Sequence, residues 1–163
     1  FVLAGSLTML KGIGNLLELV KKMKPAVKLI VIGEPRGEKA ESIYRQLSQF
    51  PNVELKGRLP HADTINHIAS AKALVSTSNF EGFPNIFLEA WACGVPVVSL
   101  HVNPGDVINE FGLGKYFNGD YAAMADCINT NGTGEINSAQ LKAYISNYHD
   151  FERAADRFIH FLN

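Results

Sequence analysis

The sequence of 163 residues predicts an α/β fold, namely a Rossmann-like, doubly wound parallel sheet with extra helices at its C-terminal end. Short runs rich in β-branched residues alternate with helical segments along residues 1–99, which is the pattern of successive strand–helix units. These runs are apolar throughout, as is typical of strands in a parallel sheet covered by helices on both faces. The composition, 47% hydrophobic and 19% charged, is that of a globular chain, so we expect one domain over residues 1–163.

Each predicted unit combines an apolar run, a loop that contains glycine or proline, and a segment with apolar residues at helical spacing. The expected strands are residues 1–5, 27–32, 53–55, 73–76 and 95–99, and the helices between them are 16–23, 38–50, 63–71 and 84–93. Beyond residue 117 the pattern becomes helical, and we expect helices over 121–129, 138–148 and 151–161 to wrap the sheet edge.

Charge and cysteine content exclude several classes of function. A formal net charge of -1 offers no concentrated basic surface for nucleic acid or an anionic membrane. The two cysteines, Cys93 and Cys127, lack the spacing of a zinc site, and they fit a reducing, cytoplasmic setting. We therefore expect no metal, no nucleic-acid partner and no membrane contact through this domain. The strand-like start without an initiator Met looks like a cut made in a longer protein.

A ligand of such a sheet binds beyond the carboxyl ends of the strands, where loops and helix N-termini converge. The first of these loops, residues 5–12, lacks the GxGxxG fingerprint, which disfavours an NAD-dependent dehydrogenase. The loop at 77–84 and the helix after it contain more groups that can bind a ligand. On that helix Glu89 is almost alone as a polar side chain, and we expect the helix to be buried nearly all round.

A carboxylate in this setting needs a hydrogen-bonding partner or a ligand cleft. Taken alone, Glu89 would be assigned to a structural network with a Lys or backbone amides. Upstream, however, lie Glu81 and a helix start with unpaired N–H groups and a positive dipole end. A carboxylate, an anion site and a second carboxylate match the sugar hydroxyls, diphosphate and ribose hydroxyls of a nucleotide sugar. Trp91, on the opposite side of the helix, is expected in the core.

Glu81 and Glu89 form an E-x₇-E motif, and the chain resembles the C-terminal, donor-binding domain of retaining GT-B glycosyltransferases of the group 1 or family four type. The resemblance spans residues 1–128 and implies one half of a GT-B fold, truncated from a two-domain enzyme. It also implies a nucleoside-diphosphate sugar as donor, no required cofactor, and an acceptor such as a polysaccharide or lipid-linked glycan. The segments that carry it are EGFPNIFLEAWACGVPVV, LKG, KLIVIG, VELKGRL and NPGDVI.

The resemblance assigns roles to residues. Glu81 holds hydroxyls of the transferred sugar, Lys11 contacts the diphosphate, and both are the catalytic candidates. Glu89 takes the ribose hydroxyls. The other donor-binding candidates are Ser6 in the first loop, Gly82 and Phe83 in the sugar loop, the backbone N–H groups of Asn85, Ile86 and Phe87, and Arg58 and Leu59 in the base-binding loop. The Phe83 ring is expected either to line the sugar pocket or to pack under its loop.

One position departs from the family pattern. Many relatives carry an Arg where this sequence has Ser6, and a hydroxyl supplies no charge for a diphosphate. Arg36 or Arg58 compensates, or the diphosphate site is weaker. His61, like the other histidines considered, is expected to be solvated.

Two other classes of function share the fold: a GT-B-type sugar-nucleotide epimerase and a non-catalytic nucleotide-binding module. The resemblance favours the transferase, with the amino-terminal acceptor domain of the same protein missing from this chain. On this interpretation the isolated domain binds nucleotide without turnover. The full-length enzyme is expected in the cytoplasm, with a peripheral place at the inner membrane face as a further option.

Overall fold

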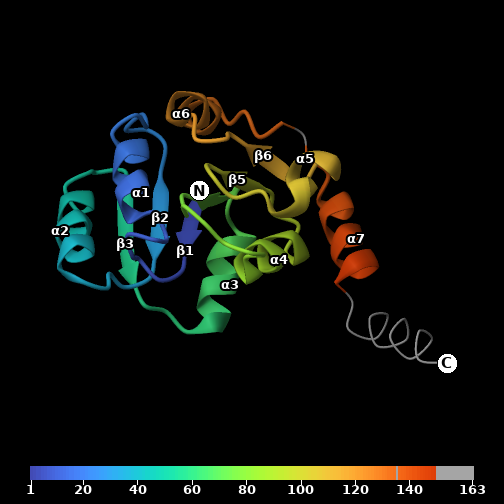
Figure 1. Ribbon diagram of the computed structural model, residues 1–163, viewed down its shortest axis with the longest axis horizontal. Helices are drawn as coiled ribbons and strands as arrows, with labels where there is room; N and C mark the ends of the chain where they lie inside the picture. The colour runs from blue at the N-terminus through green and yellow to red at the C-terminus, as the bar shows by residue number, and fades with distance from the viewer. Residues whose placement is uncertain (135, 150–163) are drawn as a thin grey trace.

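The predicted α/β fold is confirmed by the computed structural model, which describes residues 1–134 and 136–149. Within these residues six strands form an all-parallel sheet in the order β3-β2-β1-β4-β5-β6 (Figure 1). The strands are β1 (Val2–Ala4), β2 (Leu29–Ile32), β3 (Val53–Gly57), β4 (Leu74–Ser76), β5 (Val97–Ser99) and β6 (Gly114–Tyr116). The helices are α1 (Ile13–Val20), α2 (Glu38–Leu47), α3 (His61–Ala69), α4 (Asn85–Ala92), α5 (Val107–Glu110), α6 (Tyr121–Asn129) and α7 (Ser138–Tyr148), and a 3-10 turn at Pro104–Asp106 precedes α5.

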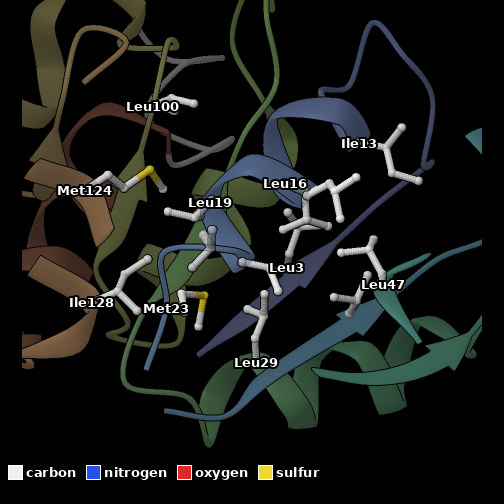
Figure 2. Close-up of a cluster of buried hydrophobic side chains, with 14 of the residues drawn as sticks. Leu3, Ile13, Leu16, Leu19, Met23, Leu29, Leu47, Leu100, Met124 and Ile128 are labelled. Carbon is white, nitrogen blue, oxygen red and sulfur yellow. The ribbon is translucent and has the colours of Figure 1, made fainter. Parts of the chain in front are cut away.

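Helices cover both faces of the sheet, as the continuous apolar strands predict. Along β1, Val2 packs into one core and Leu3 into the other, because successive strand side chains point to opposite faces. The core that contains Leu3 lies under α1, α2 and α6. Figure 2 shows part of this core, which combines Leu16 and Leu19 of α1 with Leu29 of β2 and Met124 of α6.

The second core lies on the opposite face, under α3, α4 and α7. Trp91 of α4 is fully buried there, as expected, and its Nε1–H donates to Leu113 O at 2.9 Å. Helix α4 is nevertheless not buried all round, since Asn85 and Ala92 are exposed and only one face, with Phe87, packs inward. The expectation of a helix buried nearly all round was therefore wrong, because the other side of α4 faces the carboxyl end of the sheet.

Two elements were not predicted. Strand β6 contains no apolar run, since Lys115 is exposed between two half-buried residues at the sheet edge. Its place follows from backbone pairing with β5, for which apolar side chains are not needed. Helix α5 is four residues long, too short for a hydrophobic period to show. The helix expected over 151–161 lies outside the described residues.

The strand order places a topological switch point between β1 and β4. From β1 the chain runs outward through β2 and β3, and then returns to place β4 on the other side of β1. The helices that follow β1 and β4, α1 and α4, therefore cover opposite faces of the sheet. The carboxyl ends of these two strands are the place where ligands of doubly wound folds bind.

Candidate functional site

A cavity of about 390 Å³ opens at this switch point. A second cavity of about 400 Å³ adjoins it towards β2 and β3, and the two share lining residues on the β1 loop and on α4. We call the joined space the crevice. The shared residues are Ala4, Gly5, Ser6, Ile86 and Glu89.

Lys11 and Glu81 meet at the β4 side of the crevice. Lys11 Nζ lies 2.7 Å from Glu81 Oε2, so the two side chains form an ion pair between the loop after β1 and the loop after β4. The Lys11 side chain is 41% exposed and that of Glu81 only 16%, which leaves the ammonium accessible to a ligand. Ser78, not singled out from the sequence, donates its hydroxyl to Glu81 Oε1 at 2.8 Å. Both oxygens of Glu81 are thus held, while their remaining lone pairs can accept from ligand hydroxyls.

Glu89 lies where the two cavities meet, and its side chain is 30% exposed. His61, at the start of α3, places Nε2 3.1 Å from Glu89 Oε1. The sequence predicted a solvated His61; its side chain is indeed 74% exposed, but it has a defined partner in Glu89. The sequence predicted that the Glu89 carboxylate faces either a hydrogen-bonding partner or a ligand cleft, and in the structure it faces both. This pair could not be predicted from a local sequence pattern, because the two residues are 28 positions apart.

The first turn of α4 points its backbone N–H groups into the same region. Within the described residues, the N–H groups of Asn85 and Ile86 have no protein acceptor, and both residues line the crevice. The N–H of Phe87 instead donates to Pro84 O at 3.0 Å, and its side chain is fully buried. Phe87, which the sequence placed among the donors, thus belongs to the core. Two amides rather than three face the crevice.

The aromatic ring in the loop before α4 has two environments. Phe83 lines the crevice and is 39% exposed, yet its ring also lies against Trp91 and His149 at centroid distances of 6.3 and 5.2 Å. It both borders the cavity and packs against α4 and the end of α7. Gly82 beside it is exposed and does not line the crevice, and a Cβ there would meet nothing within 4 Å.

The remaining candidates lie on the β1, β2 and β3 loops. Ser6 borders both cavities, whereas Arg36, Arg58 and Leu59 line the one towards β2 and β3. Neither arginine forms an ion pair with a carboxylate among the described residues. The crevice therefore has an ammonium group on one side and two guanidinium groups on the other.

Residues 1–134 and 136–149 contain no group of three or more His, Cys, Asp or Glu side chains placed to hold a metal ion. Among the same residues, no helix is long and apolar enough to cross a membrane.

Comparisons with known proteins show the family that the chain matches. Residues 1–130 match the model of the family described as glycosyl transferases group 1. The chain is 30% identical over 153 residues to the lipopolysaccharide 1,6-galactosyltransferase of Escherichia coli K12, which covers 86% of this chain and 43% of that protein. It is 35% identical over 126 residues to the capsular polysaccharide biosynthesis glycosyltransferase CapM of Staphylococcus aureus, covering 72% of this chain and 32% of the relative.

Solved structures share the fold. HepE of Anabaena, in complex with UDP and glucose, superposes with a TM-score of 0.78 at 22% identity, covering 99% of this chain and 48% of HepE. A TarM variant of S. aureus, in complex with Fondaparinux, alpha-GlcNAc-glycerol and UDP, gives a TM-score of 0.79 at 24% identity, covering 99% of this chain and 35% of TarM. This chain thus spans less than half the length of the relatives named here.

Proposed function

This chain belongs to the group 1 glycosyltransferases and forms a GT-B-type domain of that family, and we propose that it binds the nucleoside-diphosphate sugar from which such an enzyme transfers a hexosyl group. The observation that carries the proposal is the order of groups along the crevice. Glu81 and Lys11 lie at one end, the first-turn amides of α4 follow, and Glu89 lies where the second cavity begins.

The proposed donor fits this order from sugar to base. Glu81 accepts hydrogen bonds from hydroxyls of the transferred sugar, and Glu89 accepts from the vicinal hydroxyls of the ribose. The diphosphate lies between them, against Lys11 and the N–H groups of Asn85 and Ile86. Each favourable contact with the dipole of α4 contributes about 0.3–1 kcal/mol. The base lies in the second cavity, beside the loop that follows β3.

Lys11 has a further part in the proposed reaction. As the bond between sugar and diphosphate breaks, negative charge grows on the departing diphosphate, and an ammonium placed beside it stabilises that charge. Because Lys11 is paired with Glu81, diphosphate binding draws the ammonium away from Glu81 or makes it bridge both anions. We propose transfer with retention of configuration and without a cofactor, in which this domain orients the donor.

Arg36 is the better candidate for a second cation at the diphosphate. Leu7 N–H donates to Glu34 O at 3.1 Å and Arg36 N–H donates to Leu7 O at 3.0 Å, so the Arg36 loop is fastened to the residue after Ser6. Strand β2 also lies beside β1, whereas β3, which carries Arg58, lies one strand further from the switch point. We assign Arg36 to the diphosphate and Arg58 to the base or ribose side.

The acceptor and the rest of the enzyme lie beyond this domain in the proposal. The chain spans 43% of the E. coli galactosyltransferase, and we propose that a second domain supplies the groups that bind and activate the acceptor. The chain alone is therefore expected to bind nucleotide and to leave the sugar–diphosphate bond intact.

Calorimetric titration with UDP, GDP and ADP tests the proposal. We expect one of the three to bind, with Glu89→Gln and Lys11→Ala each weakening its binding by about tenfold, since each removes a charged hydrogen-bonding group. Glu54→Gln and Lys56→Ala are matched controls, because these two residues form another ion pair, at 2.6 Å, outside the crevice lining. Equal binding by the parent and both crevice variants would show that the nucleotide binds elsewhere.

The two arginines are separated by comparing mono- and diphosphates of the same nucleoside. Arg36→Gln is expected to weaken the diphosphate more than the monophosphate, and Arg58→Gln to weaken both alike. The reverse pattern would exchange their assignments.

A further inference from the structure

The loops that carry Lys11 and Glu81 are joined by hydrogen bonds that Asn79 donates to two backbone carbonyls. Asn79 N–H donates to Leu10 O at 3.1 Å, and Asn79 Nδ2 donates to Met9 O at 2.9 Å. The loop after β4 is thus bonded to carbonyls directly before Lys11. The distance between the ammonium and the carboxylate depends on this attachment.

Asn15, in the first turn of α1, also forms hydrogen bonds to the loop after β4. Its Nδ2 donates to Thr77 O at 2.9 Å and to Asn79 Oδ1 at 2.8 Å. Its Oδ1 accepts from the hydroxyl of Tyr121, at the start of α6, at 2.8 Å. Because Thr77 O can only accept, the orientation of the Asn15 amide is fixed. One side chain therefore connects α1, α6 and the loop that leads to Glu81.

We propose that Asn15 is a positioning residue for the donor site, which sets the separation of Lys11 and Glu81 through the β4 loop. The inference rests on the proposed function, because that separation matters only if a diphosphate and a sugar bind there. An ion pair between side chains of two loops does not fix loop geometry by itself, since exposed pairs contribute little. Asn15 bonds the β4 loop at two points, Thr77 O and Asn79 Oδ1, while the bond from Tyr121 holds its own amide in place, so a displacement of that loop breaks the first two bonds.

Asn15→Leu tests the inference, because leucine has a similar size and forms none of these bonds. Two measurements apply: hydrogen exchange of the Asn79 amide, and the ratio of dissociation constants for the mono- and diphosphate of uridine, guanosine and adenosine. In Asn15→Leu we expect faster exchange at Asn79 and a loss of about tenfold in the preference for the diphosphate, the contribution of one charged contact. Affinity for the monophosphate should change little.

Asn129→Leu is the matched control. Asn129 also joins α6 to the segment that follows α1, since its Oδ1 accepts from Lys24 N–H at 2.7 Å and its Nδ2 donates to Lys22 O at 3.0 Å, but it does not line the crevice. We expect this variant to lose stability and to keep the parent's diphosphate preference. If Asn15→Leu does not fold, Asn15→Asp keeps the shape and places an acceptor against Thr77 O.

The outcomes separate the two ideas. Equal weakening of mono- and diphosphate in the Asn15 and Asn129 variants would mean a general structural role and overturn the inference, as would an unchanged preference in Asn15→Leu. If the parent chain binds none of the nucleotides, the proposed function fails. Exchange at the Asn79 amide then decides by itself whether Asn15 holds the two loops.

Discussion

Replacing Gly12 by alanine should separate the two loops that border the proposed donor site. Gly12 has φ 73°, in the left-handed region, and a Cβ there would lie 1.7 Å from Thr77 O. No side chain can adjust to relieve this collision, because both partners are backbone. The β4 loop must therefore move away from the loop that carries Lys11.

The size of the destabilisation follows from the backbone strain and from two hydrogen bonds that break. A left-handed conformation costs a residue with a Cβ about 1–2 kcal/mol. Movement of Thr77 also breaks the bond from its Oγ1 to Gly12 O, 3.0 Å, and the bond from Asn15 to Thr77 O, each worth a net ~1 kcal/mol. The sum is about 3–4 kcal/mol, which lowers the melting temperature of a chain of this size by roughly 6–16 °C.

Thermal unfolding followed by circular dichroism measures this destabilisation, and Gly57→Ala is the control. Gly57 has φ 65°, but a Cβ there meets nothing within 4 Å, so it carries the conformational cost of about 1–2 kcal/mol alone. The difference between the two variants isolates the collision with Thr77. If Gly12→Ala destabilises the chain no more than Gly57→Ala does, the reasoning is refuted. We also expect Gly12→Ala to lose preference for a nucleoside diphosphate over the monophosphate.

Three further changes test the packing and the electrostatics. Trp91→Phe should destabilise the chain by about 2–4 kcal/mol in a urea titration followed by circular dichroism, because it leaves a void and removes the hydrogen bond from the indole to Leu113 O, which keeps only its bond from Val97 N–H. A loss below ~1 kcal/mol would contradict this. Burial, with a smaller effect of Glu18, raises the pKa of Tyr121 above its ordinary value of 10.0. The stabilisation of the fold that the protonated Tyr121 hydroxyl provides is therefore complete below pH 10 and is lost as the pH rises through the folded-state pKa. The melting temperature of Tyr121→Phe should fall less than that of the parent over that range, and parallel curves of melting temperature against pH would refute the assignment. Asp120 caps α6, because its carboxylate accepts from two N–H groups at the start of the helix, at 2.9 and 3.0 Å. Asp120→Ala should therefore lower the free energy of unfolding by about 1 kcal/mol, while Asp120→Asn should lower it little. Equal losses in the two variants would disprove the capping role.

Much of the fold was predictable because the signals are local. An apolar run such as residues 27–32 predicts a buried strand wherever it lies in space, and the structure places β2 within it. Trp91 was assigned to the core from its position on one helix, and it is fully buried. Strand β6 was missed because an edge strand is stabilised by backbone pairing with β5 and requires no apolar run.

The candidate site was predictable in part. Residue types at the ends of strands, with Glu81 and Glu89 eight positions apart, indicated acidic groups on either side of a helix N-terminus. The crevice contains both, together with Lys11 and Ser6. The partners of these groups were not predicted, because Ser78 and His61 show no distinctive pattern in the sequence. The amide of Phe87 was assigned to the diphosphate, whereas the geometry of the first helical turn directs it to Pro84 O.

The sequence by itself determined the order of strands and helices apart from β6 and α5, the burial of Trp91, and the chemical groups available after each strand, because all of these depend on neighbours in the chain. The tertiary structure alone decided which loops meet. Since β4 pairs with β1 across the switch point, Asn15 and Thr77, 62 residues apart, share a hydrogen bond. The separation of Lys11 and Glu81 therefore follows from the crossover of the chain, a property that no local pattern records.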